Sequence, residues 1–145
     1  MEELSPSSTC ELGQKEYWDQ FYSVELKNFE DHGDIGEIWF RKKNLERIVK
    51  WLEKNKVEKS APILDIGCGN GMTLITLARS GFEDLTGVDY SEKAIQLAQK
   101  IAESENVKAN LEVNFCLHDE IDIPTISFGG KTGRTVTALI MKKSP

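Results

Sequence analysis

The chain has 145 residues, with 18 Lys or Arg against 24 Asp or Glu, so its formal net charge is −6. This charge argues against a nucleic-acid backbone as the partner, and no apolar run approaches the roughly 18 residues that a membrane span needs. Its three cysteines are widely spaced and form no C-x-x-C pair, which indicates reduced thiols rather than a disulfide framework or a zinc site. We expect a monomeric protein of the cytoplasm, with the nucleus as a second location, that binds no metal, membrane or nucleic acid.

The first residues, 1–13, are acidic and contain Ser and Pro, which predicts a disordered leader ahead of a single domain over residues 14–145. Over residues 14–29 the pattern predicts a helix with aromatic side chains near one face. These side chains either pack on the domain or form a lid over a ligand. Trp39 follows in a glycine-flanked loop, where its ring either packs in the core or faces a cation. Residues 44–55 have the i, i+3, i+4, i+7 spacing of an amphipathic structural helix.

The most informative part of the chain joins an apolar strand, predicted over residues 62–66, to a helix predicted over residues 72–78. The turn between them contains Gly67, Gly69 and Gly71. Glycine suits such a turn because it permits unusual backbone angles and lets a ligand approach the backbone. The strand, turn and helix together predict a loop that binds a nucleotide cofactor.

A second apolar run, residues 85–88, ends in Asp89. Parallel strands joined by a helix bring this acid and the glycine turn to the same edge of a sheet, where the carboxylate can accept hydrogen bonds from ribose hydroxyls. Ser91 is a good N-cap for the following helix, and we expect Tyr90 and Ser91 to lie at the edge of the cofactor pocket. A third strand is predicted over residues 111–115.

The spacing of the glycines bears on the kind of cofactor. A dinucleotide fingerprint would place its third glycine at position 72, where this chain has Met72. With Asp65 two residues ahead of the first glycine, the turn resembles motif I of the seven-stranded S-adenosylmethionine-dependent methyltransferases. The resemblance implies that Asp65, the three glycines and Asn70 shape a pocket for S-adenosylmethionine and that Asp89 holds its ribose. NAD binding, and a turn that binds no ligand, stay open as alternatives.

The resemblance extends beyond the turn, over residues of about 14–113 and again from about 115 to the end. Short strings are similar to the lysine methyltransferases that modify translation elongation factor 1-alpha, namely Glu16-Tyr17-Trp18-Asp19, Gly33-Asp34-Ile35-Gly36-Glu37-Ile38-Trp39-Phe40, Gly87-Val88-Asp89-Tyr90-Ser91 and Ser127-Phe128-Gly129-Gly130. The resemblance implies an α/β fold, a Rossmann-like methyltransferase sheet with helices on both faces. It also implies that a lysine of elongation factor 1-alpha is the substrate. From their positions in the chain, we also assign Trp39, Tyr90 and Ser91 to the cofactor site.

After the third strand the chain departs from this family. Residues 115–122 and 135–141 resemble the C-terminal hairpin, so the segment that carries strands 4 and 5 is missing near residues 114–115. The groups that align and desolvate the lysine amine would come largely from that segment, and His118 is better explained as structural or exposed. We therefore assign no catalytic residue. The chain is either a protein-lysine methyltransferase or a non-catalytic shortened isoform that binds cofactor or a partner protein.

Overall fold

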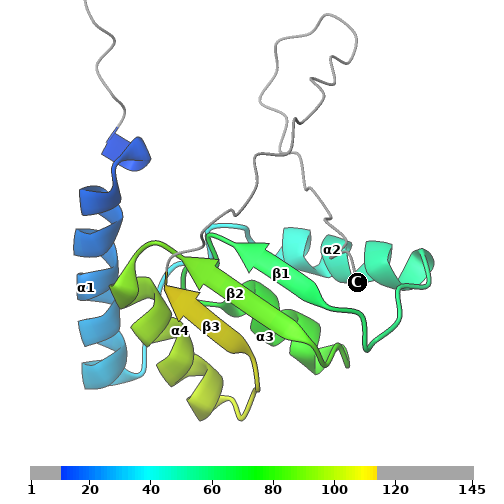
Figure 1. The fold of residues 1–145 in the computed structure, drawn as a ribbon. Coiled ribbons are helices and arrows are strands. Elements are labelled where there is room, and N and C mark those ends of the chain that lie inside the picture. The colour runs from blue at the N-terminus through cyan, green and yellow to red at the C-terminus, as the bar shows by residue number, and fades with distance from the viewer. Residues whose placement is uncertain (1–10, 114–145) are drawn as a thin grey trace, which may run out of the picture. The chain divides into compact units, whose positions relative to one another are not determined.

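The computed structural model describes residues 11–113, which all belong to one compact unit of the chain. Helices and strands alternate along most of this part (Figure 1). In chain order the elements are a short 3-10 helix η1 (Glu11–Gly13), α1 (Lys15–His32), α2 (Lys42–Lys54), β1 (Ile63–Ile66), α3 (Met72–Arg79), β2 (Leu85–Asp89), α4 (Glu92–Ser104) and β3 (Asn110–Val113). The helices and strands predicted within these residues are confirmed, with ends that differ by at most three residues.

The strands form one parallel sheet in the order β1-β2-β3 (Figure 1). Asp65 of β1 lies opposite Gly87 of β2, and Asp89 at the end of β2 lies opposite Val113 of β3. Because all three strands run in one direction, the glycine turn after β1 and Asp89 reach the same edge of the sheet. The predicted parallel α/β arrangement is therefore confirmed.

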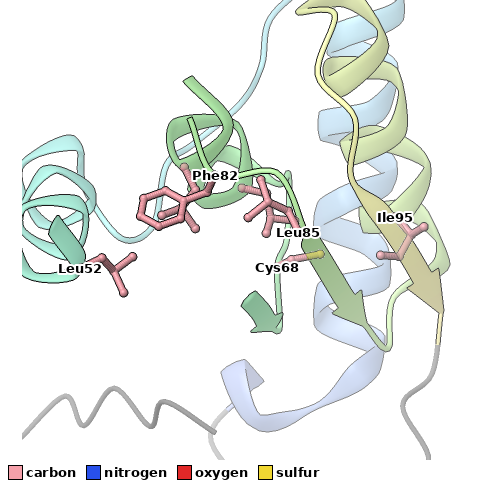
Figure 2. Packing of buried hydrophobic residues seen from close by; sticks show 7 residues of the cluster. Leu52, Cys68, Phe82, Leu85 and Ile95 are labelled. Carbon is pink, nitrogen blue, oxygen red and sulfur yellow. The ribbon is translucent and has the colours of Figure 1, made fainter. Parts of the chain in front are cut away.

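Two clusters of buried side chains hold the helices in place. The first lies between α2, α3 and the sheet and consists of Leu52, Cys68, Leu74, Leu77, Phe82, Leu85 and Ile95 (Figure 2). The second joins α1 to α3 and α4 and consists of Tyr22, Leu26, Ile75, Ala94, Leu97 and Ile101. Each fully buried Leu or Ile contributes about 2 kcal/mol of transfer free energy, so the two clusters fix the helices against the sheet.

The helices of the described part cover one face of the sheet. Helices α2, α3 and α4 pack on the side to which Ile63 points, whereas Leu64 and Ile66 on the other side are 39% and 60% exposed. Helices on both faces, which the resemblance implies for the whole sheet, are therefore not seen within residues 11–113. The crossovers from β1 to β2 and from β2 to β3 proceed in the same direction, and right-handed crossovers in one direction place their helices on one face.

Residues Glu11–Gly13, at the end of the predicted leader, form η1. Beside it, the indole N–H of Trp18 donates to the carbonyl of Leu12 at 2.9 Å. Residues 1–10, the predicted hairpin strands and the predicted break near residues 114–115 lie outside the described residues. Within residues 11–113 no helix is both long enough and apolar enough to cross a membrane.

Candidate functional site

The glycine turn between β1 and α3 has the left-handed backbone that the sequence predicts. Gly67, Gly69 and Gly71 have φ angles of 73°, 53° and 77°. A Cβ atom at Gly67 would have no neighbour within 4 Å, so the backbone at this position is open to a ligand. A Cβ atom at Gly69 would instead collide with the hydroxyl of Tyr22. The turn is thus open at its first glycine and tightly packed at its second.

The backbone N–H groups of the turn are engaged within the protein. Gly67 and Cys68 both donate to the carbonyl of Val88, at 2.8 and 3.0 Å, and Gly69 donates to the Asp89 carboxylate at 3.0 Å. A pyrophosphate binds at such a turn by taking free N–H groups at the start of the helix. The N–H groups of Gly67, Cys68 and Gly69 already have partners and are therefore not free for a phosphate.

The carboxylate of Asp89 accepts hydrogen bonds from the glycine turn and from the loop before α4. This side chain is only 7% exposed, and its second oxygen accepts a hydrogen bond from the backbone N–H of Ser91 at 2.9 Å. Ser91 is fully buried and caps α4, its hydroxyl accepting from the N–H of Ala94 at 3.3 Å, while Tyr90 beside it is exposed. A carboxylate has about four acceptor positions, so Asp89 keeps capacity for hydroxyl donors of a ligand.

A second carboxylate, Asp65, lies near the end of the adjacent strand β1. Burial raises the pKa of Asp65 to about 6, and the negative charge of Asp89 adds to this effect. Two neighbouring acids make the site favourable for a cation, since a cation would repay the cost of keeping both carboxylates ionised. Cys68 is a poor nucleophile, because burial raises the pKa of its thiol to about 12 and keeps it protonated.

The side chain of Asn70 binds a loop of the protein itself. Its amide nitrogen donates to the carbonyl oxygens of Ile35 and Glu37, at 3.0 and 3.3 Å, and its oxygen accepts from the N–H of Met72 at 3.4 Å. The loop that it contacts, residues 33–41, is called the strap below. The predicted contribution of Asn70 to a cofactor site would therefore come from its backbone.

Trp39 lies on the strap and packs against α1. Its ring is 5.2 Å from that of Trp18 and 5.7 Å from that of Phe21, in edge-to-face geometry, and its side chain remains 48% exposed. Tyr22, which the sequence indicates only as part of an aromatic face, is buried with its hydroxyl against Gly69. The aromatic periodicity of α1 marks Tyr22 as inward-facing, but only the packing of α1 brings it to the turn.

The described residues provide few groups for other chemistry. Within residues 11–113 no cluster of His, Cys, Asp or Glu could hold a metal ion. His32 is exposed at the end of α1, and His118 lies outside the described residues. The catalytic residue therefore stays unassigned, while Asp65, Asp89 and the open Gly67 define a candidate site for a cationic ligand that carries hydroxyl groups.

Comparison with known proteins places this site in context. Residues 57–131 match the family described as "Methyltransferase domain". The chain is 44% identical over 123 residues to EEF1A lysine methyltransferase 2 of Danio rerio, a match that covers 84% of this chain and 52% of the relative. It is 35% identical over 130 residues to protein-lysine N-methyltransferase EFM4 of Saccharomyces cerevisiae, covering 85% of this chain and 55% of the relative. Among solved structures, the plantazolicin methyltransferase BpumL is similar at 28% identity with a TM-score of 0.48, over 77% of this chain and 40% of that one. The chain spans about half the length of the curated relatives it matches.

Proposed function

Because the chain belongs to the methyltransferase-domain family, we propose that it binds S-adenosylmethionine at the glycine turn and is a protein-lysine methyltransferase. The proposed substrate is a lysine of translation elongation factor 1-alpha. Relatives named as an EEF1A lysine methyltransferase and a protein-lysine N-methyltransferase support this proposal. We also propose that the protein acts as a monomer in the cytoplasm and the nucleus.

The observation that carries the proposal is the combination of two acids with a turn in which the N–H groups of Gly67, Cys68 and Gly69 are engaged. S-adenosylmethionine has a sulfonium, an ammonium and a ribose, and it has no phosphate. Asp65 and Asp89 supply negative charge at one edge of the sheet, and Asp89 retains acceptor capacity for ribose hydroxyls. Gly67 leaves the backbone open. The residues present therefore fit this cofactor.

When bound, S-adenosylmethionine supplies a methyl group that an amine can attack. Asp89 would orient the ribose, and Asp65 would balance positive charge near the strand end. A lysine amine attacks only in its neutral form, and removal from water lowers the pKa of a lysine. We assign no base to this step among residues 11–113, so exclusion of water would have to provide the neutral amine.

The second candidate is a non-catalytic form that binds cofactor or a partner protein without methyl transfer. Its support is that the glycine turn and both acids lie within residues 11–113, whereas no group that would align a lysine is assigned there. The enzyme requires cofactor binding and turnover, whereas the non-catalytic form shows no turnover and binds either the cofactor or a partner protein.

Calorimetric titration of the purified chain with S-adenosylmethionine tests cofactor binding. Asp89→Asn removes the charge that would bind the ribose, and we expect its affinity to fall about 10-fold or more. Asp84→Asn is the matched control, because Asp84 is an exposed acid just before β2. A folded wild-type chain, checked by circular dichroism, that binds no S-adenosylmethionine would refute the enzyme and the cofactor-binding form, and only the form that binds a partner protein would remain.

Transfer of a labelled methyl group to purified elongation factor 1-alpha then separates the candidates. Binding with transfer supports the enzyme, and transfer that is lost in Asp89→Asn but kept in Asp84→Asn ties turnover to this site. Binding with no transfer, under conditions where a full-length relative methylates the same substrate, identifies the non-catalytic form.

A further inference from the structure

The strap connects two helices that lie at opposite ends of the helical layer. Helix α1 packs against α4, whereas α2 packs against α3 near β1 (Figure 1). The strap, residues 33–41, therefore crosses between them, and it passes the glycine turn on its way. The strap also contains Trp39, whose ring packs against Trp18 of α1.

Two side chains hold the strap from different elements. From the turn, Asn70 donates to the carbonyl oxygens of Ile35 and Glu37. From α1, a carboxylate oxygen of Glu25 accepts a hydrogen bond from the N–H of Glu37 at 3.1 Å. Glu25 also lies so close to Gly36 that a Cβ atom there would collide with it, and Gly36 has a φ of 80°. The strap is thus clamped at one short stretch of backbone.

Asn70 also belongs to the turn itself. It is 7% exposed, it lies between Gly69 and Gly71, and its amide oxygen accepts from the N–H of Met72 at the start of α3. One buried side chain therefore links the strap, the turn and the first residue of a helix. Any ligand that fixes the backbone of the turn therefore also fixes the position from which Asn70 binds the strap.

We propose that Asn70 is a positioning residue that couples the order of the strap to occupancy of the glycine turn. This inference rests on the proposed binding of S-adenosylmethionine and adds a regulatory contact to that site. Coupling is reciprocal. A ligand bound at the turn stabilises the ordered strap, and loss of order in the strap lowers the affinity for the ligand by the same factor. The strap is thereby a part of the site through the backbone carbonyls that Asn70 binds.

Hydrogen exchange and calorimetry with S-adenosylhomocysteine test the coupling without relying on activity. In the wild-type chain, we expect saturating S-adenosylhomocysteine to slow amide exchange in residues 33–41 by about 10-fold. Asn70→Ala removes two hydrogen bonds to the strap, so its affinity should fall about 10-fold and most of the protection of the strap should be lost.

Glu25 provides an independent variant, because it contacts the strap at Gly36 and Glu37 from α1. Glu25→Ala should weaken S-adenosylhomocysteine binding about 3-fold, and Glu25→Gln should restore most of the affinity because it keeps an oxygen acceptor. Leu85→Val is the control for general destabilisation, since it removes one methylene from the first cluster, and its affinity should equal that of the wild type.

Each outcome decides the inference. Wild-type affinity in Asn70→Ala, or a strap whose exchange does not respond to S-adenosylhomocysteine in the wild type, overturns the coupling while leaving cofactor binding intact. If Asn70→Ala does not fold, equal affinities in Glu25→Ala and Glu25→Gln overturn it instead. A wild-type chain that is folded and binds no S-adenosylhomocysteine refutes the proposed function, and the coupling falls with it.

Discussion

Asp65 carries a cost for the folded chain that a single substitution should remove. Burial raises its pKa from 3.8 to about 6, whereas in the unfolded chain it titrates near its ordinary value. Between these values the folded state keeps a proton that the unfolded state has lost. Stability should therefore fall as the pH rises from about 4 to about 6 and remain lower above that range. A shift of about two units corresponds to about 3 kcal/mol.

Asp65→Asn replaces the carboxylate with a neutral group of nearly the same shape. The amide also needs hydrogen-bond partners, so the gain should be smaller than the full electrostatic cost, about 1–2 kcal/mol at neutral pH. At about pH 4, where the folded wild type is protonated, the electrostatic gain should be lost, so the cost of the buried amide should leave the variant about 1–2 kcal/mol less stable than the wild type. Urea unfolding followed by circular dichroism at both pH values measures the difference, with Asp84→Asn as the exposed control.

Two results would refute this reasoning. A wild-type midpoint for Asp65→Asn at neutral pH would mean that ionisation of Asp65 costs the fold nothing. A difference that is independent of pH would mean that the substitution acts through packing or hydrogen bonding rather than through charge. The same substitution should weaken S-adenosylmethionine binding, so the variant should gain stability and lose affinity together.

Three further predictions concern the turn and its neighbours. Gly69→Ala should destabilise the chain by about 1–3 kcal/mol, because φ is 53° and the methyl group meets the hydroxyl of Tyr22; an unchanged urea midpoint would contradict the close approach. Ser91→Ala should cost about 1 kcal/mol in the same assay through loss of the cap to Ala94, and no loss would mean that this hydrogen bond does not support α4. Cys68, with a pKa raised to about 12 by burial, should resist iodoacetamide at neutral pH while folded and react in urea; rapid labelling of the folded chain would show that the thiol is accessible.

The sequence predicts the local elements well because their signals are local. The apolar run before Gly67, the helical spacing after Gly71 and the acid at the end of β2 each lie within a few residues, and the structure confirms these elements. The clamp on the strap could not be predicted, since Asn70 and Ile35 are 35 residues apart and no local pattern pairs them. The approach of Tyr22 to the turn depends in the same way on how α1 packs.

The two acids of the site would respond differently to relaxed selection. Asp89 satisfies the N–H groups of Gly69 and Ser91, so a descendant that had lost its ligand would still be selected to keep this acid for folding. Asp65 has no such hydrogen bonds among the described residues, and its buried charge is expected to lower the stability of the fold. Once ligand binding no longer mattered, a neutral residue at this position would be favoured. A homologue that has a neutral residue at the position of Asp65 but keeps Asp89 would therefore be expected to have lost ligand binding while keeping the fold.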